Sequence, residues 1–237
     1  MHRAALAALG LDDWHYQRLP VPPELLEQAV RALPAAGFVG ANVTLPHKEA
    51  ALAVADTSSD PARRAGAANT LTFGPDGVIH ADNTDIGAVA AVLPESVGSG
   101  LVLGAGGSAR AAVIALLDAG ADVRVHNRTV ERAEALAADL AVAVARDTSP
   151  RGGDVLVNCT TLGLADADPA PAAPAGFGLV VDLVYREGPT ALAQQARDAG
   201  VPVVDGLEIL ARQGALSLAG WTGRQPSLDV MLAAARA

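Results

Sequence analysis

The chain has 237 residues, enough for one large domain or two small ones. Hydrophobic residues make up 51% of it and charged residues 18%, a balance that excludes intrinsic disorder. Its 17 basic and 26 acidic side chains give a formal net charge of −9, which disfavours a nucleic-acid partner because a phosphate backbone would be repelled.

The first 84 residues alternate helical and strand-like patterns. Alanine and leucine predict a helix that begins near Arg3 and that Gly10 stops. Prolines introduce a second helix near residue 24, and a third helix carries Lys48 in its first turn. Asp-Gly turn chemistry between the last two strands predicts a β-hairpin. The expected strands are 16–21, 38–43, 70–73 and 78–81.

Strand and helix patterns then alternate from residue 85 to residue 206, which predicts a parallel sheet with helices on both faces. The clearest unit is a strand at 101–103, a glycine-rich loop, a helix at 111–119 and a strand at 122–126. The remaining expected elements are strands at 155–158, 179–182 and 201–204 and helices at 130–140 and 190–199.

These patterns predict an α/β protein of two domains. An N-terminal α/β domain spans residues 1–84, and the helical pattern of residues 207–237 predicts that the C-terminal helices pack back on it. A Rossmann dinucleotide-binding domain spans residues 85–206.

The glycine-rich loop follows an apolar strand and opens a helix, the context in which such a loop binds a dinucleotide. Gly104 would make the tight turn, Gly106 would admit the pyrophosphate, and the small Ala109 would let the helix close on the strand. The alternative is a tight strand-to-helix turn that binds nothing. The predicted cofactor-binding residues of the loop are Gly104, Ala105, Gly106, Gly107, Ser108 and Ala109.

A basic segment stands where an NAD site would carry an acidic residue, about 20 residues beyond the loop. The chain has Asn127, Arg128 and Thr129 there, and Arg132 follows one helical turn later. A guanidinium suits a 2′-phosphate, so the sequence predicts NADP in preference to NAD. Alternatively, both arginines are solvated charges at a helix start.

Lys48 and Asp85 are the candidate catalytic residues. Lys48 lies at a strand-to-helix turn and Asp85 near the start of a helix, both close to the junction of the predicted domains. A lysine there can exchange a proton with a carbonyl-hydroxyl pair, and a carboxylate can orient it. Taken alone, however, Lys48 is typical of a surface charge and Asp85 of a helix N-cap. His47 is a rival acid-base candidate.

The chain resembles the shikimate dehydrogenase family over nearly its whole length. The resemblance implies reduction of 3-dehydroshikimate with NADPH in the route to aromatic amino acids, with Lys48 and Asp85 as the catalytic pair. It further implies that residues 1–84, with 207–237 returning to them, form the substrate-binding domain. In that domain Thr44, Asn69 and Gln213 would hold substrate hydroxyls. Tyr185 would approach the substrate carboxylate. The matching segments are 42–48, 66–70, 83–87, the glycine-rich loop, 127–129, 158–163, 182–185 and 213–215.

Two departures from the family pattern stand out. Members usually begin with a strand and a Ser-x-Ser-Pro segment, whose hydroxyls bind the substrate carboxylate, before a Met-His pair; this chain begins at that pair, Met1 and His2. We therefore expect the central strand of the first sheet and both serines to be absent, and we favour a start codon assigned too late. The second departure is that Glu187 stands where the family usually has a proline.

Two alternatives to this enzyme are an NADP(H)-binding module without turnover and a quinate or related dehydrogenase. We expect a cytoplasmic protein, because residues after Met1 form no export signal, no apolar run approaches the roughly 20 residues of a membrane span, and one cysteine forms no disulfide. That residue, Cys159, is expected to be a small buried apolar group and rules out a multi-cysteine metal site. The oligomeric state is open, with a homodimer as an option.

Overall fold

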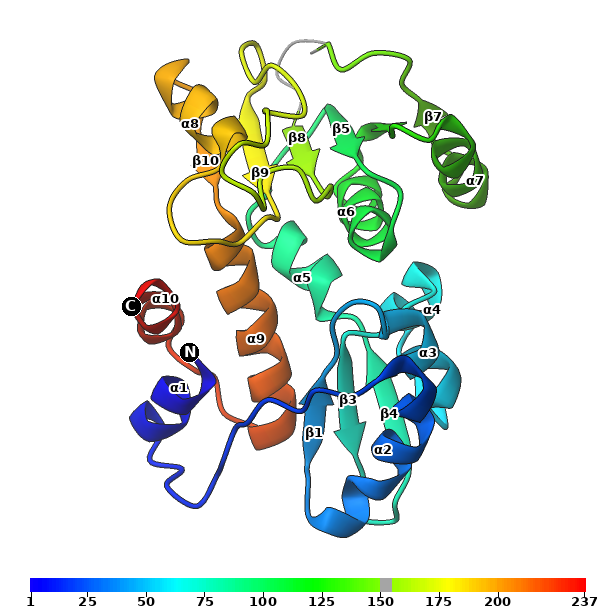
Figure 1. Ribbon diagram of the computed structural model, residues 1–237, viewed down its shortest axis with the longest axis vertical. Coiled ribbons are helices and arrows are strands. Elements are labelled where there is room, and N and C mark those ends of the chain that lie inside the picture. Colours follow the sequence, from blue (N-terminus) through cyan, green and yellow to red (C-terminus); the bar gives the residue numbers. More distant parts are fainter. Residues whose placement is uncertain (150–154) are drawn as a thin grey trace. The chain divides into compact units, whose positions relative to one another are not determined.

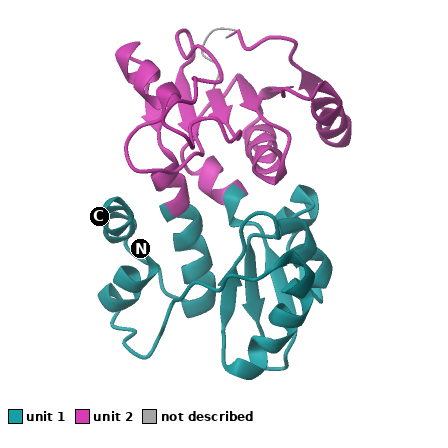
Figure 2. Cartoon of the chain, in the orientation of Figure 1, with its two compact units in different colours: residues 1–85, 211–237 teal, residues 86–210 magenta. Residues whose placement is uncertain are grey.

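Two separate β-sheets organise the chain in the computed structural model, which describes residues 1–149 and 155–237 (Figure 1). Contacts divide the chain into two compact units (Figure 2). Unit 1 contains residues 1–85 and 211–237, and unit 2 contains residues 86–210. The C-terminal residues pack with the N-terminal ones, as predicted. The assignment of substrate to the first part and nucleotide to the second stays a prediction.

Unit 1 contains a four-stranded sheet in the order β1-β3-β4-β2. The pairs β1–β3 and β3–β4 are antiparallel, and β2–β4 is parallel. The strands are β1 (Gly40–Asn42), β2 (Thr57–Ser58), β3 (Thr70–Phe73) and β4 (Ile79–Asp82). The helices that lie within this unit are α1 (His2–Ala8), α2 (Leu26–Ala32), α3 (Lys48–Val54), α4 (Asp60–Ala65) and α10 (Leu228–Arg236). Two 3-10 turns, Pro23–Leu25 and Pro34–Ala36, flank α2.

The two faces of this sheet differ in polarity, because successive side chains of a strand point to opposite sides. Leu71 and Phe73 of β3 and Ile79 of β4 are buried in an apolar cluster with residues of α2 and α3. The opposite face is polar. Residues of this face, together with Thr84 and three residues of a C-terminal helix, line a pocket of about 340 Å³: Thr70, Thr72, His80, Asp82, Thr84, Leu216, Ser217 and Gly220.

The predicted strand at residues 16–21 is wrong. This segment has no regular secondary structure, and most of its side chains are exposed. Among the described residues, β1 pairs only with β3 and no strand lies beside residues 16–21. An extended segment becomes a strand only when a neighbour satisfies its backbone groups, so the local pattern was insufficient.

Unit 2 contains a six-stranded sheet in the order β10-β9-β8-β5-β6-β7, in which every pair is parallel. Numbered along this unit, the strands run 3-2-1-4-5-6, the order of the Rossmann fold. The strands are β5 (Ser99–Leu103), β6 (Asp122–His126), β7 (Ala143–Val144), β8 (Val155–Asn158), β9 (Leu179–Asp182) and β10 (Val203–Val204). The helices within it are α6 (Gly107–Asp118), α7 (Val130–Leu140) and α8 (Ala191–Asp198). The predicted parallel sheet is confirmed.

Apolar clusters cover both faces of this sheet. Val102 of β5 belongs to the cluster that includes α6 and α7, while its neighbours Leu101 and Leu103 belong to the cluster that includes α8. This is the arrangement predicted from the alternating strands and helices. The chain passes between the units within α5 (Thr84–Ala90) and within α9 (Gly206–Thr222).

Candidate functional site

The structure brings Lys48 and Asp85 into direct contact within unit 1. Lys48 begins α3, and Asp85 lies in the first turn of α5. Lys48 Nζ donates a 2.6 Å hydrogen bond to Asp85 Oδ2, and the two side chains are only 13% and 12% exposed. Asp85 lies inside the helix, so its interpretation as an N-cap was wrong. Lys48 pairs with a carboxylate away from bulk water, so a free surface charge does not describe it either.

Lys48 is also the only lysine of the chain, since the other 16 basic residues are arginines. An arginine stays protonated at any ordinary pH and cannot act as a proton donor in turnover, whereas a lysine can. This compositional signal, which our sequence prediction did not use, separates Lys48 from every other basic residue.

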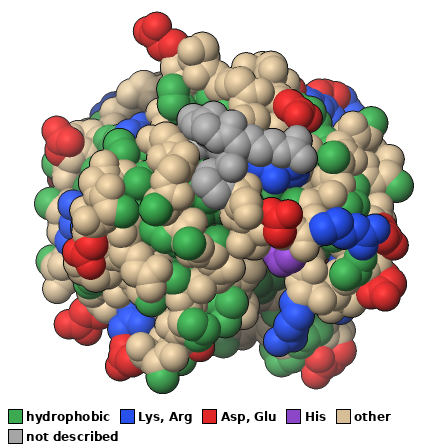
Figure 3. All heavy atoms as spheres, turned by 90° about the horizontal axis from the view of Figure 1, so that it is seen from above, with side chains coloured by type: hydrophobic (Ala, Val, Ile, Leu, Met, Phe, Trp, Pro, Cys, Tyr) green, Lys and Arg blue, Asp and Glu red, His purple; other side chains and the backbone are tan. Residues whose placement is uncertain are grey.

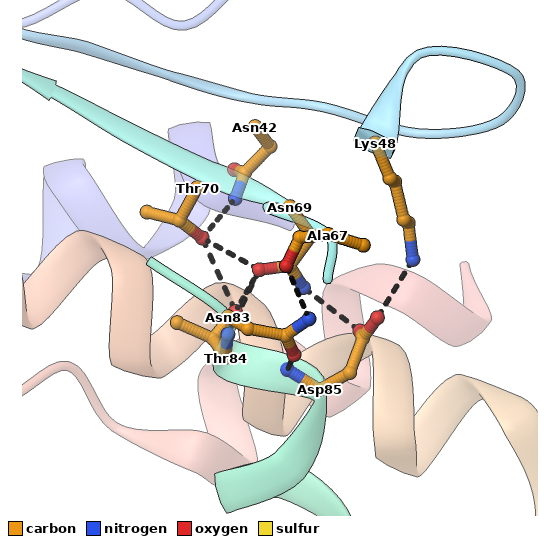
Figure 4. A network of polar contacts seen from close by, with 8 residues as sticks. All are labelled: Asn42, Lys48, Ala67, Asn69, Thr70, Asn83, Thr84 and Asp85. Carbon is orange, nitrogen blue, oxygen red and sulfur yellow. Dashed lines mark hydrogen bonds and ion pairs between the residues drawn. The ribbon is translucent and has the colours of Figure 1, made fainter. Parts of the chain in front are cut away.

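Asn69 holds the second carboxylate oxygen of Asp85 (Figure 4). Its Nδ2 donates to Asp85 Oδ1 over 2.8 Å, while its Oδ1 accepts from the backbone N–H of Thr84 over 2.8 Å. The side chain of Asn69 is buried. A second asparagine, Asn83, accepts a hydrogen bond from the backbone N–H of Asp85 and donates to the carbonyl of Ala67. The carboxylate is therefore held at both oxygens and at its own backbone.

A group of polar residues that the sequence did not predict lies behind Asn69. Asn42 donates to Ser217 Oγ over 3.0 Å and accepts from Tyr16 Oη over 3.0 Å. Thr70 and Thr84 each lie within hydrogen-bond distance of Asn69. Asn42, Thr70 and Thr84 lie inside the segments 42–48, 66–70 and 83–87 that match the family, so the match could have drawn attention to them. No local pattern, however, indicates that the three side chains lie close together.

The other predicted substrate-binding residues are Thr44, Gln213 and Tyr185. Thr44 is exposed, and its carbonyl accepts from the backbone of His47. Gln213 lies part-exposed on α9 of unit 1, and Tyr185 is 50% exposed in unit 2. The imidazole of His47 makes no hydrogen bond to Lys48 or Asp85 among the described residues.

The glycine-rich loop connects β5 to α6 in unit 2. Gly104 has φ of +110°, and a Cβ there would lie 3.0 Å from the carbonyl oxygen of Cys159. Gly106 is the N-cap of α6, and a Cβ there would meet nothing within 4 Å. The helix begins at Gly107, four residues earlier than predicted, so Gly107, Ser108 and Ala109 form its first turn and Ala105 precedes the N-cap. Backbone N–H groups at such a helix start can donate hydrogen bonds to an anion.

The predicted basic segment follows β6. Asn127 donates to the carbonyl of Thr129, which is the N-cap of α7. Arg128 and Arg132 are exposed, and in the described residues neither forms an ion pair. Both guanidinium groups are therefore available to an anion. On the face seen in Figure 3, basic side chains stand singly or in small groups among acidic ones.

A buried carboxylate, Asp182, joins three elements of unit 2. It is 1% exposed and accepts from Asn158 of β8 over 2.9 Å and from Thr190, the N-cap of α8, over 2.5 Å. Burial raises the pKa of this carboxyl, although these hydrogen bonds oppose the shift. Cys159 follows β8 and is half-buried.

No cluster of three or more His, Cys, Asp or Glu side chains is poised for a metal ion in the ranges 1–149 and 155–237. A search of the same residues finds no helix with the length and hydropathy of a membrane span.

Two family models match the chain. Residues 1–71 match the shikimate dehydrogenase substrate binding domain, and residues 206–236 match the shikimate 5′-dehydrogenase C-terminal domain.

Curated relatives match most of the chain. The shikimate dehydrogenase (NADP(+)) of Methylobacterium radiotolerans is 45% identical over 249 residues, covering 95% of this chain and 86% of the relative. The enzyme of the same name from Paracoccus denitrificans is 43% identical over 233 residues, covering 91% of this chain and 82% of the relative.

Among solved structures, the shikimate 5-dehydrogenase of Thermus thermophilus, in complex with NADP(H) and shikimate, superposes with a TM-score of 0.90. It is 39% identical and covers 99% of this chain and 92% of its own.

Proposed function

We propose that this chain, which belongs to the shikimate dehydrogenase family, reduces 3-dehydroshikimate to shikimate with NADPH. The observation that carries the proposal is the 2.6 Å contact between Lys48 Nζ and Asp85 Oδ2, made by side chains that are largely removed from water. The small-molecule substrate and NADP are those named for the relatives.

Lys48 is the proposed proton donor. Reduction of a ketone adds a hydride to the carbonyl carbon and a proton to the oxygen, and the Nζ ammonium of Lys48 supplies that proton. NADPH, when bound, supplies the hydride. The position demands an amine, because an arginine would keep the charge and lose the ability to give up a proton.

Asp85 and Asn69 are the proposed orienting groups. Asp85 holds the ammonium through Oδ2, while its Oδ1 accepts from Asn69. The Asn69 amide has two N–H bonds and gives one to Asp85, so the second is available to a substrate hydroxyl. We extend the same role to Thr44 and Gln213, and assign the half-exposed phenol of Tyr185 to the substrate carboxylate.

The residues of unit 2 fit NADP. Space lies open at Gly106, the first turn of α6 offers N–H groups, and Arg128 and Arg132 stand without acidic partners among the described residues. In our proposal the helix N-terminus takes the pyrophosphate and the arginines take the 2′-phosphate. A homodimer and a cytoplasmic location stay predictions.

The test compares the wild-type chain with Lys48→Arg and Lys48→Ala. NADPH consumption with 3-dehydroshikimate should be fast for the wild type and fall by about 10²- to 10⁴-fold in both variants. Lys48→Arg is the matched variant, because it keeps the positive charge beside Asp85. Its NADPH affinity and unfolding midpoint should equal those of the wild type.

Wild-type turnover by Lys48→Arg would overturn the assignment of the proton donor. If the wild type binds NADPH but reduces no 3-dehydroshikimate, the result favours the binding module without turnover.

A further inference from the structure

Three hydrogen-bond donors, two side-chain hydroxyls and one backbone N–H, converge on the carbonyl oxygen of one asparagine in unit 1. Oδ1 of Asn69 accepts from Thr84 Oγ1 and from Thr70 Oγ1, each over 3.1 Å, and from the backbone N–H of Thr84 over 2.8 Å. A carbonyl oxygen has two lone pairs, so this acceptor is saturated from inside the protein. All three residues are at most 6% exposed.

These donors fix the orientation of the Asn69 amide group, including its NH₂ end. The backbone N–H of Thr84 can only donate, so the oxygen of the Asn69 amide must face it and the NH₂ group must point the other way, at Oδ1 of Asp85. The two hydroxyls donate to the same oxygen and reinforce this orientation. The hydroxyls of Thr70 and Thr84 thus act on Asp85 through Asn69, and Asp85 in turn holds Lys48 (Figure 4).

The Thr70 hydroxyl is itself held by Asn42, whose Nδ2 lies 3.5 Å from Thr70 Oγ1. The two hydroxyl oxygens lie 3.2 Å apart, and because each gives its one proton to Asn69 they are in contact without sharing a proton. The Asn42 amide also donates to Ser217 of α9. A continuous chain of polar contacts therefore leads from α9 through β1 and β3 to the start of α5, where Asp85 stands.

We propose that Thr84, together with Thr70, is a positioning residue. The two hydroxyls orient the Asn69 amide toward Asp85 and so fix the position of the carboxylate that binds Lys48. This inference rests on the proposed function, since it assigns a role in that reaction. Neither threonine would touch the substrate or the nicotinamide.

The arrangement allows a clean substitution. Valine is close to threonine in size and replaces only the hydroxyl, so Thr70→Val and Thr84→Val remove the two donors from residues that also line the pocket of about 340 Å³ on the polar face of the sheet. Thr72 lines the same pocket from the same strand, and in the described residues its hydroxyl joins no part of the network. Thr72→Val is therefore the matched control.

The principal experiment measures kcat and KM for wild type, Thr70→Val, Thr84→Val, the double variant, Thr84→Ser and Thr72→Val. Loss of both hydroxyl donors should lower kcat roughly tenfold, with smaller losses for the single variants. The KM for NADPH should not change. Thr84→Ser restores the hydroxyl and should recover kcat, while Thr72→Val should equal the wild type. A double variant with wild-type kcat would overturn the proposal.

A double-mutant cycle with Asp85→Asn separates positioning from a general loss of packing. If the threonines act through Asp85, combining Thr70→Val and Thr84→Val with Asp85→Asn should lower kcat little further, because the carboxylate that they position is already absent. Losses that multiply independently would contradict the proposal.

A second measurement does not need turnover. The side-chain NH₂ resonances of Asn69 should shift, and exchange faster with solvent, in the double valine variant but not in Thr72→Val. Unchanged Asn69 resonances would overturn the proposal even in an inactive preparation. An inactive wild type with the expected Asn69 response would count against the proposed function alone.

Discussion

Lys48 Nζ and Asp85 Oδ2 lie 2.6 Å apart although 37 positions separate the two residues in the chain. Lys48 begins α3 and Asp85 lies in the first turn of α5. Because each side chain is about seven-eighths removed from solvent, each charge depends on the other for compensation.

A thermodynamic cycle should reveal this dependence. Lys48→Met leaves the Asp85 carboxylate without its cation, and we expect it to destabilise the fold by about 1 to 3 kcal/mol. Asp85→Asn in the same chain should recover part of that loss, because no uncompensated charge remains. Denaturant unfolding of the two single variants and the double variant measures the coupling. Strictly additive losses would contradict a functional ion pair.

The arginines after β6 should decide between the two nicotinamide cofactors. Removing both guanidinium groups with Arg128→Ala and Arg132→Ala should weaken NADPH binding roughly 10- to 100-fold and leave NADH binding nearly unchanged, because only NADPH carries the 2′-phosphate. Binding titrations with each cofactor test this. Arg197→Ala, an exposed arginine at the end of α8, is the control and should alter neither affinity. Equal losses for both cofactors would refute the assignment.

Two glycines of one loop should respond differently to alanine. Gly104→Ala is strained by a φ of +110° and by the nearby Cys159 carbonyl, so we expect a loss of stability of about 1 to 3 kcal/mol. Gly106→Ala meets no protein atom within 4 Å, so stability should hold while NADPH affinity falls, since the pyrophosphate needs that space. Unfolding midpoints and NADPH titrations separate the two effects. An unchanged affinity in Gly106→Ala would show that the phosphates lie elsewhere.

The buried ring of His2 should make unit 1 sensitive to acid. Its ring stacks on Tyr16 with centroids 3.9 Å apart, and Nε2 has no hydrogen-bond partner among the described residues. Burial lowers the pKa of His2 from 6.5 to about 4. In the unfolded chain His2 is therefore protonated below about pH 6.5, whereas in the folded chain it is protonated only below about pH 4.

The free energy of unfolding therefore keeps its full value above pH 6.5. It falls as the pH drops toward 4, and the loss due to His2 is at most about 3 kcal/mol. His2→Phe keeps an aromatic ring against Tyr16 and cannot titrate. The difference in unfolding free energy between wild type and His2→Phe should change across this pH window and stay constant above it. A constant difference throughout would mean that His2 is hydrated.

Local patterns predicted most elements but failed where an element depends on a distant partner. The loop from β5 to α6 was predicted because its residues are adjacent in the chain, and only the helix start was misplaced, at 111 in place of Gly107. The segment 16–21 carried a strand pattern and formed no strand, since no neighbour pairs with it among the described residues. The short strands β2 and β7 and the helix α4 went unpredicted.

The sequence by itself determined most of the strands and helices, the glycine-rich loop, the basic segment after β6 and the family, because each depends on residues close together in the chain. Only the tertiary structure decided that Asn42, Asn69, Thr70, Thr84 and Ser217 form one hydrogen-bonded network behind Asp85. Hydrogen bonds need atoms within about 3 Å, and between residues up to 175 positions apart that distance is set by strand register and helix packing, which no local pattern contains.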